Sequence, residues 1–96
     1  SLAMSVKTIK IVTVKHPGMN VPFTFKVPET LDLCVGDRVL VNTKKAQCEM
    51  ARCITPSFKI DEPVLMDLYG LNADKLMPVV GFLRPIMYAF ENTEKD

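Results

Sequence analysis

Three cysteines and one histidine are the residues of this chain best suited to bind a metal ion or to act in catalysis. Cys34, Cys48, Cys53 and His16 are of the types that bind zinc. Structural zinc sites usually contain two pairs of closely spaced ligands, whereas here four residues separate Cys48 from Cys53 and there is no second pair. On a strand, positions 48 and 53 face opposite sides of the sheet because they differ by an odd number. We therefore predict no metal site and expect the cysteines to pack in the core.

A cysteine nucleophile would need a histidine base within hydrogen-bond reach. The only histidine, His16, is followed by Pro17 and Gly18, and this turn sequence predicts a solvent-exposed imidazole. The chain also has no Gly-rich phosphate loop, no Ser elbow and no metalloprotease helix motif. We therefore expect a protein that is not an enzyme and that uses no cofactor.

Basic residues form the candidate binding site. In the strands expected below, alternation points several of them outward, and two more lie at a hairpin tip. The predicted nucleic-acid-binding residues are Lys26, Arg38, Lys44, Lys45 and Arg52. A ribbon of positive side chains on adjacent strands can follow a phosphate backbone, and counterion release then makes binding strongly salt dependent. The competing interpretation is ordinary solvated surface, because no exposed aromatic residue is expected among these charges.

The charges are unevenly distributed along the chain. Residues 1–60 contain nine Lys or Arg and four Asp or Glu, giving +5, whereas residues 61–96 contain three and seven, giving −4. Such a split is typical of a basic surface for an anionic partner, although small domains also show it by chance.

Two strands are expected in the first third of the chain. Residues 6–15 are rich in β-branched side chains, with apolar residues on both faces at Ile11 and Val12, so this strand is expected to be covered on both sides over part of its length. Apolar and polar residues then alternate over 21–27, which predicts a half-buried strand with Phe23 and Phe25 in the core.

The remaining elements follow turn signals. Gly36 is suited to the tight turn before a β-hairpin with strands at 38–42 and 48–54. Phe58 and Ile60 are expected to cap one end of the sheet. A short helix is predicted over 63–69 with Gly70 as its stop, then a helical turn capped by Asn72, then a last strand at 79–83.

These elements predict a mainly β protein, a small antiparallel β-barrel (SH3-like) of about five strands with one short helix. One domain is expected over residues 4–90, with a cloning remnant at 1–3 and a frayed polar tail at 91–96. No apolar run approaches the roughly 20 residues of a membrane span, so no membrane partner is expected. The odd cysteine count and the lack of a secretory signal favour the cytoplasm.

One part of the chain resembles known families. It consists of the run FTFKVPE at 23–29, the leucines at 31 and 33, the run VGDRVLVNT at 35–43 and a hairpin return near Ile54. The pattern resembles small proteins of bacterial prophages and mobile elements, in which a strand with an aromatic residue, valine and proline precedes a valine-glycine-aspartate-x-valine turn and strand. It resembles, more distantly, the N-terminal domain of the primosomal replication helicase, a small barrel that recognises the 3′ ends of DNA strands. The resemblance covers about residues 8–54 and carries over no catalytic or ligand residues.

Two functional hypotheses follow. The first is a non-enzymatic accessory module of a phage or mobile element that binds DNA or RNA weakly through the basic ribbon, or binds a protein that does. The alternative is a protein–protein interaction or structural module of unknown partner, with an acidic tail and exposed strand edges that mediate association. A clustered positive face favours the first hypothesis, and an apolar patch or a free edge favours the second.

Overall fold

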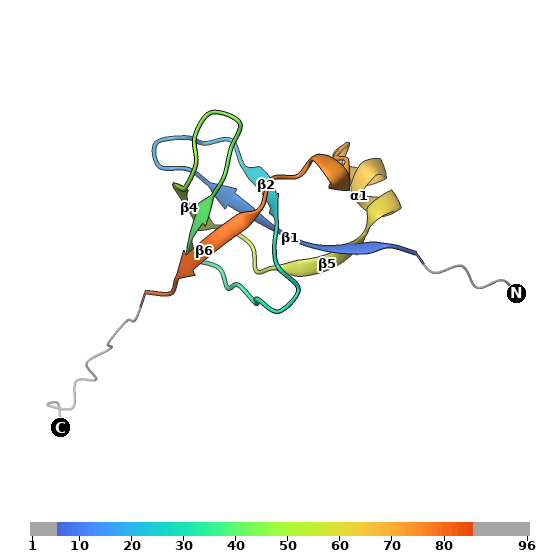
Figure 1. Cartoon of the computed structure of the whole chain (residues 1–96), viewed down its shortest axis with the longest axis horizontal. Helices are drawn as coiled ribbons and strands as arrows, with labels where there is room; N and C mark the ends of the chain where they lie inside the picture. Colours follow the sequence, from blue (N-terminus) through green and yellow to red (C-terminus); the bar gives the residue numbers. More distant parts are fainter. Residues whose placement is uncertain (1–5, 86–96) are drawn as a thin grey trace, which may run out of the picture.

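The structure is a computed structural model that describes residues 6–85 (Figure 1). The remnant expected at 1–3 and the polar tail expected at 91–96 lie outside these residues. The elements in chain order are β1 (Thr8–Lys15), β2 (Phe23–Lys26), β3 (Arg38–Val41), β4 (Glu49–Cys53), β5 (Phe58–Asp61), α1 (Glu62–Tyr69), the 3-10 turn η1 (Ala73–Lys75) and β6 (Val79–Leu83). Within the described residues the fold is mainly β, with one α-helix.

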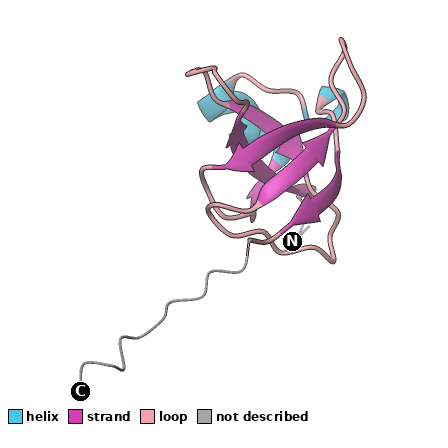
Figure 2. Ribbon diagram, turned by 90° about the vertical axis from the view of Figure 1, so that its left-hand side faces the viewer, coloured by secondary structure: helices cyan, strands magenta, loops and turns pink. Residues whose placement is uncertain are grey.

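The six strands form one antiparallel sheet in the order β2-β1-β4-β3-β6, with β5 paired to the first half of β1. The sheet is strongly curved, as Figure 2 shows. It is not closed, because β2 and β6 at the two ends of the order are linked only by a parallel bridge between Lys26 and Pro78. All five predicted strands are present, but the prediction of about five missed β5, which was expected only as a cap.

The core has two parts, which lie on opposite faces of β1. Val12 and Val14 are fully buried in the larger cluster inside the curved sheet. Ile11 points to the other face, where it packs with Leu65 of α1 and with η1. The predicted coverage of β1 on both sides is therefore confirmed, and α1 is the element that covers the outer face.

Helix α1 ends where the sequence predicts and begins one residue earlier, at Glu62. Pro63 occupies its first turn, where a missing N–H costs nothing. Gly70 ends it with a left-handed φ of 67°; the Gly70 N–H donates to the Met66 carbonyl at 2.9 Å, and the Leu71 N–H donates to the Leu65 carbonyl at 3.5 Å. The Asn72 side chain caps η1 by accepting from the Asp74 N–H at 2.9 Å. Among the described residues, no helix is both long and apolar enough to cross a membrane.

The long loop between β2 and β3 is held by ion pairs. The Asp37 side chain, buried at 2% exposure, accepts from Arg84 Nε at 3.0 Å, from Arg84 Nη2 at 2.9 Å and from the Cys34 N–H at 2.8 Å. The buried Lys10 amine donates to Asp32 Oδ1 at 2.6 Å and to the Glu29 carbonyl at 3.0 Å. Gly36 has a φ of 93°, which confirms the predicted glycine turn.

Candidate functional site

The cysteines and the histidine are not placed as the sequence predicted. Only Cys53 is buried, whereas Cys34 and Cys48 are exposed, because both lie in loops outside the strands. Burial raises the pKa of the Cys53 thiol to about 11, so this group is protonated at neutral pH. Within residues 6–85 no three His, Cys, Asp or Glu side chains cluster in a way that could hold a metal ion.

His16 lies inside the structure and is not the exposed imidazole that its turn predicted, since its side chain is only 12% exposed. Its Nδ1 lies 3.4 Å from the Met50 carbonyl oxygen and 3.9 Å from a carboxylate oxygen of Glu49. Its ring centroid lies 5.4 Å from that of Phe23 and 6.1 Å from that of Phe25. His16 therefore packs between the end of β4 and the two aromatic side chains of β2.

Three cations lie in one row across neighbouring strands. Arg38 of β3 lies directly opposite Arg52 of β4, and Arg52 lies directly opposite Lys15 of β1. Residues opposite each other share a face of the sheet, and their Cα atoms are about 5 Å apart. Arg38 and Arg52 alternate with buried residues, so the row points outward. We call Lys15, Arg38 and Arg52 the basic row.

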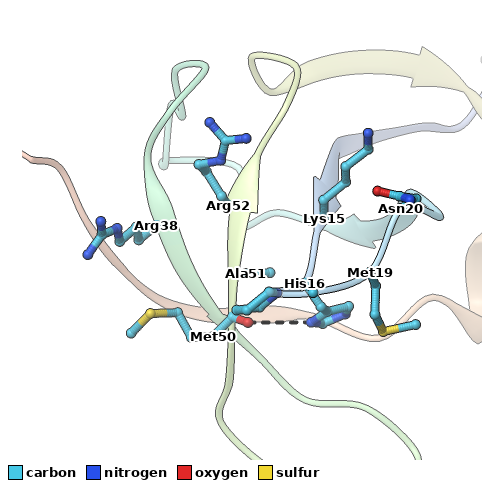
Figure 3. A pocket seen from close by; sticks show the side chains of 10 residues that line it. Lys15, His16, Met19, Asn20, Arg38, Met50, Ala51 and Arg52 are labelled. Atoms are coloured by element: carbon cyan, nitrogen blue, oxygen red, sulfur yellow. Dashed lines mark hydrogen bonds between the residues drawn. The ribbon is translucent and has the colours of Figure 1, made fainter.

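The basic row borders a hollow of about 470 Å³. Its other walls come from the β1–β2 loop, including His16, Met19 and Asn20, and from Met50 of β4. Figure 3 shows the Arg52 and Lys15 side chains extending in the same direction, while Arg38 extends to the side. Like charges directly opposite each other in a sheet are destabilising. The basic row therefore costs the fold some stability and leaves a concentrated positive charge beside a cavity.

A second and larger hollow of about 910 Å³, here called the groove, lies on the other side of His16. The β1–β2 loop and the β3–β4 loop, both near the top of Figure 1, contribute to its walls. Its apolar lining comes from Met19, Phe23, Phe25, Leu71, Leu76 and Met77. Lys44, Lys45 and Lys75 also line it, together with Glu49 as the single acidic residue.

The position of Phe23 corrects the sequence prediction. Phe25 is buried at 5% exposure as expected, but Phe23 is 40% exposed and Val21 is 57% exposed. The strand pairing of β2 with β1 ends at Phe23 opposite Val14, so no further strand covers the side chains beyond it. An exposed aromatic side chain therefore lies among lysines, contrary to the prediction from alternation that Phe23 is buried in the core.

The five predicted basic residues separate into three places. Arg38 and Arg52 belong to the basic row, whereas Lys44 and Lys45 line the groove. Lys26 is exposed on β2 and lines neither hollow. They therefore do not form one continuous ribbon.

Sequence reasoning also missed two basic residues, Lys15 of the basic row and Lys75 of the groove. Lys15 ends a strand that was expected to be covered on both faces, and Lys75 lies in a turn of the acidic part of the chain. Their positions beside the other basic residues depend on strand register and loop packing.

The cations of the two hollows are not neutralised by neighbouring carboxylates. Residues 6–85 contain eleven Lys and Arg, of which Lys10, Lys59 and Arg84 form ion pairs within 4.0 Å with carboxylates of the described chain. Six of the other eight line the hollows: Lys15, Arg38, Arg52, Lys44, Lys45 and Lys75. The two hollows share His16, Pro17, Met19 and Met50, so they form neighbouring parts of one surface.

Comparisons with protein-family models, with curated proteins and with solved structures found no match to this chain. The function is therefore inferred from the residues and their geometry.

Proposed function

We propose that this protein is a non-enzymatic module that binds nucleic acid, with the basic row of Lys15, Arg38 and Arg52 contacting the phosphates. The observation that carries the proposal is the placement of these three cations in one row across β1, β4 and β3. No carboxylate of residues 6–85 lies within ion-pair distance of any of them. Unpaired, closely spaced cations on an exposed face bind phosphates by releasing counterions.

The distribution of charge over residues 6–85 supports the same surface. The net charge is only +1, yet most of the described acidic residues lie elsewhere: Asp61, Glu62, Asp67 and Asp74 lie on or beside α1 and η1, and Asp32 and Asp37 pair with Lys10 and Arg84. Glu49 is the one acidic residue that lines a hollow. The positive charge is therefore separated from most of the negative charge. Such a separation can steer an anionic polymer toward one face even when the chain is nearly neutral.

The proposal also covers the fold family and the biological setting that the sequence predicts. We infer that the curved sheet belongs to the SH3-like small barrels and that the chain serves a phage or mobile element as an accessory protein. The support is the resemblance of residues 8–54, together with a sheet whose two ends approach each other at the bridge between Lys26 and Pro78.

Titration of labelled DNA and RNA strands tests the proposal. Single and double strands are titrated with the protein at about 20 and about 150 mM salt, followed by fluorescence anisotropy. The triple variant K15Q/R38Q/R52Q should bind more weakly to every strand. Its plot of log affinity against log salt should be less steep by about 2 units on single strands, because each lost phosphate contact removes about 0.7.

The matched control removes the same charge from another part of the surface. The variant K7Q/K26Q/K59Q also loses three positive charges, but none of these residues lines either hollow. It should keep most of the affinity. Equal losses in the two triple variants would reduce the effect to net charge, and a wild-type protein that binds no strand at low salt would overturn the proposal.

A specific observation favours protein association as the second candidate function. Strand β6 lies at one end of the strand order, and its residues Val80, Phe82 and Leu83 are 49%, 44% and 61% exposed. A free strand edge with apolar side chains can pair with a strand of another chain. Analytical ultracentrifugation tests this: V80K should abolish any concentration-dependent dimer, and a wild-type protein that stays monomeric at high concentration excludes self-association through β6.

A further inference from the structure

We propose that the groove holds an unpaired base, stacked on Phe23, so that the protein prefers single strands to duplexes. This inference rests on the proposed function and adds to it a site for the base, whereas the basic row accounts only for phosphate contacts. The juxtaposition that carries it is a half-exposed aromatic ring in an apolar groove of about 910 Å³ that three lysines also line.

Phe23 has the properties of a stacking platform. Its side chain is 40% exposed, so part of the ring is open to a ligand. The His16 ring lies 5.4 Å away at an interplanar angle of 60° and supports it from the protein side. His16 is itself packed against Phe25, which is 5% exposed, so the support is part of the folded core. A ring held in this way stacks with any base, because every base has a π face.

The surroundings of Phe23 match a nucleotide in charge as well as in polarity. Leu76 and Met77 supply apolar surface for the base. Lys44, Lys45 and Lys75 supply positive charge for the phosphates of the nucleotide. These lysines come from the β3–β4 loop and from η1, and none has an ion-pair partner within the described residues. A volume of about 910 Å³ lies within the range of small-ligand sites.

The groove continues toward the basic row. His16 and Met19 line both hollows, so a strand whose base lies on Phe23 can pass over them to Arg52 and Lys15. A duplex keeps its bases stacked inside and cannot place one on Phe23 without first breaking that base pair. The arrangement therefore favours single strands.

The experiment separates base contacts from phosphate contacts. The probes are an oligothymidylate of about 12 nucleotides, an abasic strand with the same number of phosphates, and a duplex of the same length. Wild type should bind the oligothymidylate about tenfold more tightly than the abasic strand. The variant F23L, which keeps an apolar side chain, should lose this difference and bind the abasic strand as wild type does.

A tryptophan reporter gives an independent measurement. The chain has no tryptophan, so F23W introduces a single indole at the proposed platform. Its fluorescence should be quenched by the oligothymidylate and not by the abasic strand. The matched control is F82L, because Phe82 is 44% exposed but lies on β6 beside Arg84. This substitution should leave the affinities for the oligothymidylate and for the abasic strand unchanged.

The outcomes distinguish this inference from the proposed function. Equal, salt-dependent binding of both strands by wild type would overturn the base site and leave phosphate binding by the basic row intact. If no strand binds, the proposed function fails, and quenching of F23W by thymidine monophosphate then decides the groove: quenching retains the base site and its absence removes it. Quenching by an acidic, phenylalanine-containing peptide but by no nucleotide would assign the groove to a protein partner and overturn the inference.

Discussion

Two loops on either side of β3 are held in opposite ways. The β2–β3 loop, residues 27–37, is tied to distant parts of the chain: Lys10 of β1, Ser57 before β5 and Arg84 after β6 all bond to it. The β3–β4 loop, residues 42–48, is joined to a distant segment at its start, where the Asn42 N–H donates to the Pro78 carbonyl at 3.3 Å, and beyond that point it is closed by its own bonds. The Thr43 hydroxyl accepts from the N–H groups of Lys45 and Ala46, and the Asn42 side chain accepts from the Cys48 N–H.

The difference indicates separate roles for the two loops. In the β2–β3 loop the charged groups of Asp32 and Asp37 are paired with cations of the same chain, so these charges stabilise the fold. In the β3–β4 loop, Lys44 and Lys45 have no such partner among residues 6–85, and the local bonds hold the loop without them. A charge that the fold does not use is available to a ligand. The comparison therefore predicts which charges matter for stability and which for binding.

The largest expected effect on stability is that of D37A. Asp37 is 2% exposed and accepts three hydrogen bonds, two of them from the Arg84 guanidinium. Its loss leaves the Cys34 N–H without its acceptor and frees the end of β6. We expect the free energy of unfolding to fall by about 3 kcal/mol, measured by urea denaturation followed by circular dichroism.

The isosteric variant D37N tests the charge separately from the shape. Its free energy of unfolding should fall less than that of D37A, because the amide oxygen can still accept one hydrogen bond. A D37A protein as stable as wild type would contradict the assignment of the β2–β3 loop to stability.

Acid should remove the same contribution in the wild type. The hydrogen bonds from Arg84 hold the pKa of Asp37 below its usual range, with help from the Cys34 N–H and against the opposing effect of burial. Because the pKa is lower in the folded state, the stabilisation is complete above about pH 4 and is lost as the pH falls through the folded value. The stability difference between wild type and D37N should therefore narrow below about pH 4 in urea titrations. A constant difference down to about pH 2 would contradict the ionised pair.

A smaller effect is expected for K10M. Lys10 is 7% exposed, and methionine can fill the volume of its stem. The variant loses the bonds to Asp32 and to the Glu29 carbonyl, but Asp32 is exposed and can return to water. In the wild type, the hydrogen bond from Lys10 also lowers the pKa of Asp32 in the folded state. This shift should disappear in an NMR titration of K10M. We expect a loss of about 1 kcal/mol, and a loss as large as that of D37A would place the main support of the loop at Lys10.

The fold was largely predictable because its strands carry strong local signals. Apart from β5, the ends of the strands and of the helix were predicted to within two residues. The signals were β-branched residues, alternation and the turn glycines at 36 and 70. β5 was missed because four residues, FKID, are too short to show a period, and its strand geometry comes from pairing with β1. Sheet closure depends on contacts between β2 and β6, which no local pattern specifies.

The candidate site was predictable only in part. Alternation correctly placed Arg38 and Arg52 outward, but it could not show that they lie opposite each other and next to Lys15, because register is a tertiary property. Alternation also predicted the face of the sheet on which Phe23 lies, but not how far its side chain is buried. Whether a residue at a strand end is covered depends on the loops around it, and here the loops leave Phe23 open to the groove.

The smallest effect on stability is expected for the double variant K44Q/K45Q. Both side chains are exposed, and the backbone bonds that Thr43 and Asn42 make do not involve the lysine amines. The free energy of unfolding should change by less than about 0.5 kcal/mol. Affinity for single strands at low salt should nevertheless fall several-fold, and more than in the control K7Q/K26Q, which removes two charges outside the groove. A variant that is destabilised without a loss of affinity would place Lys44 and Lys45 with the structural charges, and the contrast between the two loops would then be wrong.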